Sequence, residues 1–175
     1  MKRAVFLDRD GVINRAIVRD GKPYPPASLL DMEILPGVYE ALQKLHNANY
    51  LLIVVTNQPD VARGIAKKQD IELMHAYLSS KLPIDVFKTC YHDNKDRCIC
   101  RKPLPGALLE AAQQYDINLP TSFMVGDRWR DIEAGASAGC KTFFIDYNYA
   151  EKKPNKPDFI VSSLLDVKKM ILGKV

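Results

Sequence analysis

The stretch AVFLDRDGV, residues 4–12, is the segment around which the fold is predicted to be organised. Its apolar run ends abruptly in two carboxylates, Asp8 and Asp10, which are followed at once by Gly11. In an open α/β sheet, ligands bind outside the carboxyl ends of the strands. A strand that ends in Asp-x-Asp-Gly therefore places two acids where chemistry is expected, although an acidic turn after a strand is also common without any function.

Other apolar runs of strand length lie at residues 51–56, 122–127, 141–146 and 158–161, with a weaker one at 85–91. Apolar runs without alternation are typical of strands buried on both faces of a parallel sheet. Helical spacing occurs between the runs, with helix starts expected at Pro36, Asp70, Pro105, Asp131 and Ser163. This alternation predicts an α/β fold with a doubly wound, Rossmann-like parallel sheet, formed by one domain over residues 1–175.

Composition limits the classes of partner. The net charge is +4 and the basic residues are dispersed, so we expect no nucleic-acid partner. No segment approaches the ~20 apolar residues of a membrane span, and the run after Lys2 and Arg3 is broken at Asp8, which is unlike a signal peptide. Three of the four cysteines crowd into one loop, which favours metal binding in a reducing compartment. We therefore predict a cytoplasmic monomer that does not associate with membranes.

Polar residues follow several of the predicted strands. Asp8, Thr56 and Asp127 each stand at a strand end, and the carboxyl ends of parallel strands share one edge of the sheet. Asp8 and Asp127 together can bind Mg²⁺, which prefers carboxylate and carbonyl oxygens. Thr56 offers a hydroxyl to a phosphoryl oxygen, and Lys102 offers a positive charge. Asp131 has two interpretations, a helix cap or an outer partner of the metal or of Lys102.

This set of residues suits phosphate-ester hydrolysis in two steps. Asp8 attacks phosphorus and forms an aspartyl phosphate while Asp10 protonates the leaving oxygen. Asp10 then activates the water that hydrolyses the intermediate. The sequence therefore predicts a Mg²⁺-dependent phosphomonoesterase. A non-catalytic phosphate-binding or zinc-stabilised module is the alternative from another class, and it needs neither a nucleophile nor a proton donor.

A second metal site is predicted from local spacing. Cys90, His92, Cys98 and Cys100 offer three thiolates and one imidazole within residues 90–100, a set suited to tetrahedral Zn²⁺. All four positions are protein ligands, so the site is expected to be structural. Because Cys100 directly precedes Arg101 and Lys102, a zinc ion would fix the loop that directs both cations at the substrate.

Four motifs together resemble the haloacid dehalogenase (HAD) superfamily of phosphatases: residues 6–12 (FLDRDGV), 55–58 (VTNQ), 101–103 (RKP) and 125–131 (VGDRWRD). The resemblance implies that Asp8 is the nucleophile, that Asp10 is the acid and base, and that Thr56 and Lys102 bind phosphate. It also implies Mg²⁺ on Asp8, Asp127 and the backbone carbonyl of Asp10. Superfamily members often carry a cap domain, for which neither gap between the motifs is long enough here.

The cysteine loop followed by Arg-Lys-Pro is similar to two bacterial subfamilies. One is the D-glycero-D-manno-heptose 1,7-bisphosphate 7-phosphatases, which serve lipopolysaccharide biosynthesis, and the other is the histidinol-phosphate phosphatases. Residues 61–64 (VARG) favour the heptose subfamily, whereas Pro59-Asp60 departs from its usual pattern and leaves the substrate open. A polynucleotide end phosphatase is a third, weaker alternative. The resemblance and the charges predict substrate-binding roles for Asn57, Gln58, Arg63, Arg101, Asp20 and Tyr24, and supporting roles for Asp131 and Arg128.

Overall fold

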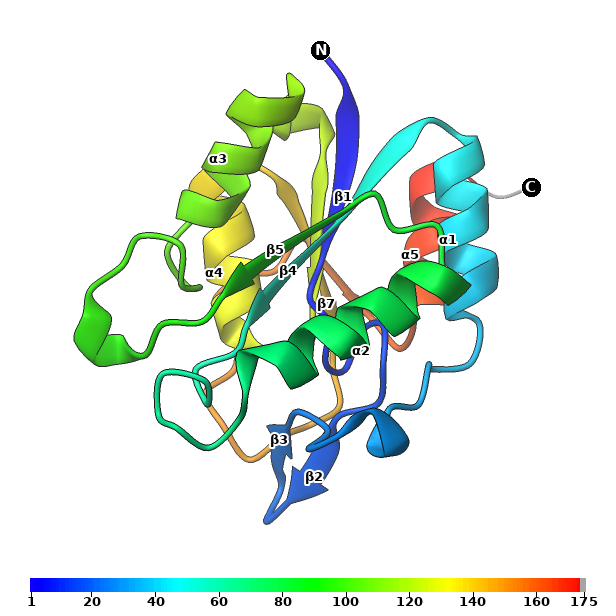
Figure 1. Cartoon of the computed structure of the whole chain (residues 1–175). Helices are drawn as coiled ribbons and strands as arrows, with labels where there is room; N and C mark the ends of the chain where they lie inside the picture. Colours follow the sequence, from blue (N-terminus) through cyan, green and yellow to red (C-terminus); the bar gives the residue numbers. More distant parts are fainter. Residues whose placement is uncertain (174–175) are drawn as a thin grey trace.

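The computed structural model describes residues 1–173, and its centre is one parallel sheet. The strand order is β5-β4-β1-β6-β7-β8. The strands are β1 (Arg3–Leu7), β4 (Tyr50–Asn57), β5 (Val86–Cys90), β6 (Phe123–Gly126), β7 (Lys141–Ile145) and β8 (Phe159–Val161). Leu7 of β1 pairs with Val54 of β4 on one side and with Val125 of β6 on the other. The segment that ends in Asp8 is therefore at the middle of the sheet (Figure 1).

Helices cover both faces of the sheet (Figure 1). The helices are α1 (Val38–Asn47), α2 (Lys68–Lys81), α3 (Gly106–Tyr115), α4 (Trp129–Ala138) and α5 (Leu164–Leu172). Side chains of β1 alternate between two apolar clusters. Val5 and Leu7 pack with residues of α1, α2 and α5, whereas Ala4 and Phe6 pack with residues of α3 and α4. Burial on both faces explains why this strand reads as an unbroken apolar run, and the predicted doubly wound α/β fold is confirmed.

Helix starts differ from the predicted positions by up to two residues. At α5 the Ser163 side chain accepts a hydrogen bond from the Asp166 backbone N–H, as the capping pattern predicts. Before α1, however, Gly37 has a left-handed φ of 77°, so Pro36 lies outside the helix. The α2 helix begins at Lys68 rather than at Asp70. These shifts leave the order of elements unchanged.

Regular structure that the sequence did not predict lies in residues 17–24. β2 (Ile17–Arg19) and β3 (Lys22–Tyr24) form an antiparallel hairpin. Short 3₁₀ turns occur at Leu29–Asp31, Asn94–Asp96 and Leu119–Thr121. The hairpin is far smaller than a cap domain, so the cleft is edged by the hairpin and by loops. Among the described residues, none of the helices has the length and apolar character needed to span a membrane. The single-domain organisation stays a prediction.

Candidate active site

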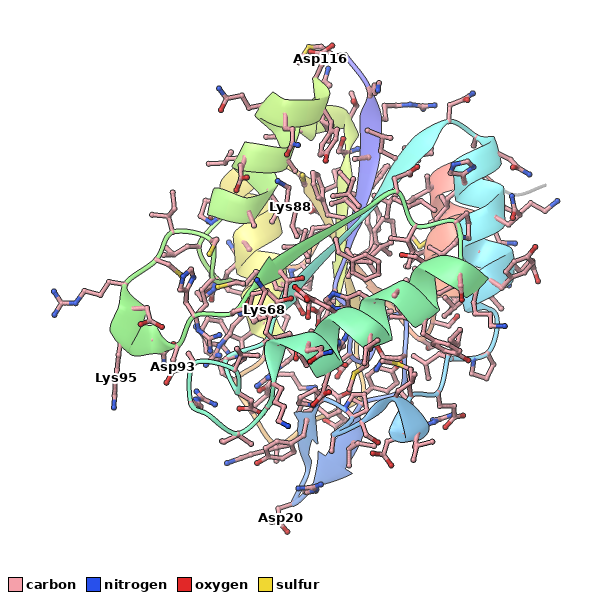
Figure 2. All side chains as sticks on the ribbon, viewed as in Figure 1. Asp20, Lys68, Lys88, Asp93, Lys95 and Asp116 are labelled. Carbon is pink, nitrogen blue, oxygen red and sulfur yellow. The ribbon has the colours of Figure 1, made fainter. Side chains whose placement is uncertain are left out.

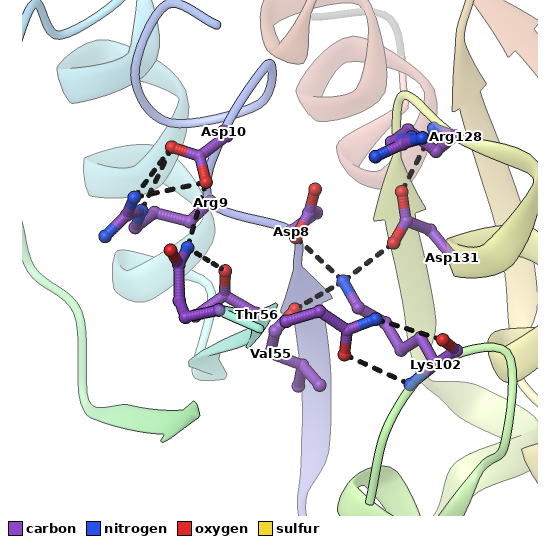
Figure 3. A network of polar contacts seen from close by, with 10 residues as sticks. Asp8, Arg9, Asp10, Val55, Thr56, Lys102, Arg128 and Asp131 are labelled. Carbon is purple, nitrogen blue, oxygen red and sulfur yellow. Dashed lines mark hydrogen bonds and ion pairs between the residues drawn. The ribbon is translucent and has the colours of Figure 1, made fainter. Parts of the chain in front are cut away.

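Lys102 is the centre of a buried ionic network at the carboxyl end of the sheet (Figure 3). Its Nζ lies 2.7 Å from Asp8 Oδ1, 2.7 Å from Asp131 Oδ1 and 2.6 Å from the Val55 carbonyl oxygen. Burial alone would lower the pKa of Lys102, but the charges of Asp131 and Asp8 outweigh it and raise that pKa above its usual value. Lys102 therefore stays charged, and it holds the Asp8 side chain at the end of β1 in place.

Asp8, Asp127 and Asp131 each offer one carboxylate oxygen, and these three oxygens lie within 4.8 Å of one another. Burial and the neighbouring Asp131 raise the pKa of Asp8 to about 6. Burial and the charge of Asp8 raise the pKa of Asp127 well above its usual value. Within residues 1–173, the buried Oδ1 of Asp127 has no hydrogen-bond partner. Crowded carboxylates with an unpartnered oxygen fit a hard divalent cation, because such an ion would supply the missing positive charge.

Asp10 is held by three polar side chains. Arg9 donates to both carboxylate oxygens, at 2.9 Å to Oδ1 and 3.1 Å to Oδ2. Asn14 Nδ2 donates to Oδ1 at 2.9 Å, and Gln58 Nε2 donates to Oδ2 at 3.0 Å. Asp10 also lines the main cleft. In Figure 3 its carboxylate points toward Arg9 and not toward Asp8.

Arg9 was not singled out by the sequence, although it is fully buried. Its Nη1 lies 3.2 Å from His75 Nε2, and the His75 ring stacks on Phe87 at 4.4 Å between centroids. Burial and the Arg9 charge lower the pKa of His75 to about 4, so the ring is neutral and Nε2 accepts from the guanidinium. An arginine beside two acids is ordinary for a solvated turn, so the sequence carried no signal for this burial.

The end of β4 supplies three polar side chains with different tasks. Thr56 is buried and its Oγ1 accepts from Gln58 Nε2 at 2.9 Å. Asn57 brackets the backbone of Lys102, with its Nδ2 donating to the Lys102 carbonyl at 3.0 Å and its Oδ1 accepting from the Lys102 N–H at 3.1 Å. Asn57 thus ties the second motif to the third. Gln58 is buried between Thr56 and Asp10, and it is not among the residues that line the cleft.

The cleft above these residues has a volume of about 510 Å³ and is rich in cations. The cationic residues that line it are Arg19, Lys22, Arg63, Arg101, Lys102, Arg128 and Arg130. Two of these cations already have protein partners, since Arg63 pairs with Asp60 and Asp93 and Arg128 pairs with Glu151. An excess of positive charge over one cleft suits an anionic substrate.

The remaining predicted residues lie in different settings. Tyr24 of β3 lines the cleft, but Asp20 lies exposed at the turn of the hairpin and points outward (Figure 2). Arg101 lines the cleft, and its Nε donates to Asn94 Oδ1 at 2.9 Å. Asp131 serves both of its proposed tasks, because it pairs with Lys102 and its Oδ2 accepts from the Arg128 N–H at the start of α4. The structure thus gathers most of the predicted set but leaves Asp20 outside the cleft and turns Gln58 inward.

The cysteine loop brings its four predicted ligands together. The Sγ atoms lie 3.7 Å apart for Cys90 and Cys98, 3.5 Å for Cys98 and Cys100, and 3.2 Å for Cys90 and Cys100. His92 Nδ1 lies 3.6 Å from Cys90 Sγ and 3.4 Å from Cys100 Sγ. A zinc tetrahedron with Zn–S bonds of about 2.3 Å has S···S edges of roughly 3.8 Å. Two of the three S···S distances lie near that value and the third is shorter, and the four groups fit a structural Zn²⁺ ion.

Comparisons with known proteins identify phosphatases as relatives of this chain. A family described as "HAD-hyrolase-like" matches residues 99–167. A D-glycero-beta-D-manno-heptose-1,7-bisphosphate 7-phosphatase of Pasteurella multocida is 32% identical, over 99% of this chain and 98% of that protein. A D-glycero-alpha-D-manno-heptose-1,7-bisphosphate 7-phosphatase of Mycobacterium bovis is 37% identical, over 78% of this chain and 75% of that protein.

A solved structure shares the whole architecture. It is the D,D-heptose 1,7-bisphosphate phosphatase of B. bronchiseptica complexed with magnesium and phosphate. It superposes with a TM-score of 0.79 at 29% identity and covers 97% of this chain and 98% of its own. Phosphatases of this superfamily use Mg²⁺ and hydrolyse phosphomonoesters. On this sequence identity and coverage, the chain belongs to the HAD-like phosphatase family that includes the D-glycero-D-manno-heptose-1,7-bisphosphate 7-phosphatases.

Proposed function

We propose that this phosphatase removes the 7-phosphate of D-glycero-D-manno-heptose 1,7-bisphosphate through an aspartyl-phosphate intermediate on Asp8. The observation that carries the mechanism is the position of Asp8 in the cleft at the end of the central strand, where Lys102 holds one of its carboxylate oxygens. The substrate assignment is supported by the names of the relatives that match most of this chain. It is also supported by the several cations around the cleft, since the substrate carries two phosphates.

In the first step an Asp8 oxygen attacks phosphorus and the bond from phosphorus to the sugar oxygen breaks, while Asp10 gives its proton to that oxygen. In the second step water attacks phosphorus, Asp10 takes a proton from the water, and the bond from Asp8 to phosphorus breaks. Thr56 and Lys102 bind the phosphoryl oxygens. Asp8, Asp127 and the Asp10 carbonyl would hold Mg²⁺, which would supply the positive charge that neutralises the phosphoryl group.

The predicted substrate contacts lie on two sides of the cleft. Tyr24 lies on the hairpin side of the cleft, whereas Arg63 and Arg101 lie on the side of the loops after β4 and β5. Arg101 and Arg63 are held by polar partners, so their guanidinium groups are preorganised for an anion or a hydroxyl. We propose that these residues, with Asn57, contact the substrate. A monomeric state, a cytoplasmic location and the absence of a nucleic-acid partner remain predictions.

The test is phosphate release with Mg²⁺ from three substrates side by side: the alpha and beta anomers of the heptose 1,7-bisphosphate, and histidinol phosphate. A value of kcat/KM at least tenfold higher for one of the heptose anomers is the expected result. A preference for histidinol phosphate would retain the mechanism but overturn the substrate assignment. The variant Asp8→Asn measures the background, because it lacks the proposed nucleophile.

A further inference from the structure

Asp127 has one carboxylate oxygen that is held and one that is not. Tyr149 donates a hydrogen bond from its hydroxyl to Asp127 Oδ2 at 2.9 Å, whereas Oδ1 is buried without a partner among residues 1–173. We propose that Tyr149 is a positioning residue for the magnesium site, whose hydroxyl fixes Asp127 so that Oδ1 is presented to the ion. This inference rests on the Mg²⁺-dependent mechanism proposed above, and it concerns a residue outside all four motifs.

The space around Asp127 explains why a single hydrogen bond can decide its orientation. Its carboxylate lies directly against the backbone of Gly11, so that a Cβ atom at Gly11 would stand 2.0 Å from Asp127 Oδ2. Gly11 itself has a φ of 89°, a left-handed conformation that favours glycine. The carboxylate is therefore confined on the side of the first motif, and the Tyr149 hydroxyl is the donor that the structure gives to Oδ2.

The Tyr149 ring is held by its own loop, which follows β7. Asn148 has a left-handed φ of 57°, and its N–H donates to Asp146 Oδ1 at 2.7 Å. The rings of Tyr147 and Tyr149 stack at 5.5 Å between centroids, and the Tyr147 hydroxyl donates to the Gly11 carbonyl at 2.9 Å. The loop thus brings two phenol hydroxyls to the site, one to the Asp127 carboxylate and one to the Gly11 carbonyl.

The other two carboxylates of the cluster do not depend on this loop. Asp8 is held by Lys102, and Asp131 is held by Lys102 and by the Arg128 N–H. Asp127 shares neither of these donors, so its orientation has one source in the described residues, which is Tyr149. Outer partners of metal ligands set the ligand geometry, and their loss costs roughly 10–100-fold in metal affinity or activity.

The matched pair of variants is Tyr149→Phe and Tyr147→Phe. Each removes one hydroxyl from the same stacked pair and keeps the ring. We expect the dissociation constant of Mg²⁺, measured by calorimetry on the zinc-loaded enzyme, to rise about tenfold in Tyr149→Phe. In Tyr147→Phe it should change less than twofold. At saturating Mg²⁺, Tyr149→Phe should recover the parent KM for the substrate, because the cleft itself is unchanged.

Two results would overturn the inference: a change below threefold in Tyr149→Phe, or an equal change in both variants, which would assign the effect to loop packing. Melting temperature and zinc content confirm that both variants are folded. Asp127→Asn separates this inference from the proposed function. If Asp127→Asn bound Mg²⁺ as the parent does, the magnesium site would itself be misassigned. If Asp127→Asn lost Mg²⁺ while Tyr149→Phe did not, only the role of Tyr149 would be wrong.

Discussion

The two candidate metal clusters are assembled in opposite ways. The four zinc ligands all come from residues 90–100, with the buried Cys90 at the end of β5 and the other three on the loop that follows it. The three carboxylates come from the ends of β1 and β6 and from the start of α4, and all are buried. The first cluster is built by local spacing and the second by the order of strands in the sheet. The zinc loop is therefore expected to contribute order, whereas the carboxylates contribute chemistry.

Replacing the nucleophile in the carboxylate cluster should have a greater effect than any other substitution considered. Asp8→Asn removes the nucleophile while keeping the size of the side chain, so we expect kcat to fall by at least about 10⁴-fold. Zinc content should stay at one ion per chain, because the cysteine loop is not touched. Phosphate-release kinetics and metal analysis on the same sample measure both quantities. Full activity in this variant would remove Asp8 from the mechanism.

A substitution in the zinc loop, by contrast, should lower both the stability and the activity of the enzyme. Cys100→Ser removes a ligand, and we expect the unfolding free energy to fall by about 4 kcal/mol. At this chain length that corresponds to a decrease in melting temperature of roughly 10 °C. Activity should fall by about 10–100-fold because the loop no longer fixes Lys102. Cys140→Ala is the control, since Cys140 is buried outside the loop and zinc should be retained. A native parent enzyme free of zinc would contradict the assignment.

Asn57 connects the two regions, and its replacement should produce a smaller effect. Asn57→Ala removes both hydrogen bonds to the Lys102 backbone, and we expect kcat to fall about tenfold, which corresponds to ~1.4 kcal/mol. Zinc content and melting temperature should stay close to those of the parent. An unchanged kcat would show that Lys102 is positioned without the two Asn57 hydrogen bonds.

A smaller change is expected in the affinity for Mg²⁺ when the pH is lowered. Burial and the charge of Asp131 raise the pKa of Asp8 to about 6, so the fraction of protonated Asp8 grows as the pH falls through this value. Because Mg²⁺ binds the ionised form, its apparent dissociation constant should rise about fourfold from pH 7.5 to 5.5. Calorimetric titration at both values measures the change, and an increase in affinity toward acid pH would have the wrong sign for this site.

The difference between the clusters also explains what sequence could predict. The zinc ligands are readable from spacing, and Asp8, Thr56 and Asp127 are readable because parallel strands end at one edge. The residues that donate hydrogen bonds to these groups could not be predicted from the sequence. Arg9 reaches His75 of α2, and Tyr149 reaches Asp127 from the loop after β7. Such contacts depend on packing between elements distant in sequence, for which the chain shows no pattern.

Two of the predicted substrate-binding residues have side chains that do not face the cleft. Gln58 follows the β4 strand, as a ligand contact would, but its side chain turns inward to Thr56 and Asp10. The sequence predicts that Asp20 binds substrate, yet the hairpin turn carries it outward. A polar residue in a loop gives no sign of which way the side chain points, because turn geometry and burial decide it. The roles assigned to both residues therefore lack support from the geometry.

The order of the strands also matters while the protein is being made. Synthesis proceeds from the N-terminus, so the four zinc ligands have all left the ribosome once Cys100 has emerged. At that moment β6, which lies beside β1 and leads to Asp127, is still inside the ribosome. A nascent chain can therefore acquire zinc well before its carboxylate cluster exists. The loop that holds Lys102 is available first, and the chemistry becomes possible only when the central sheet receives its later strand.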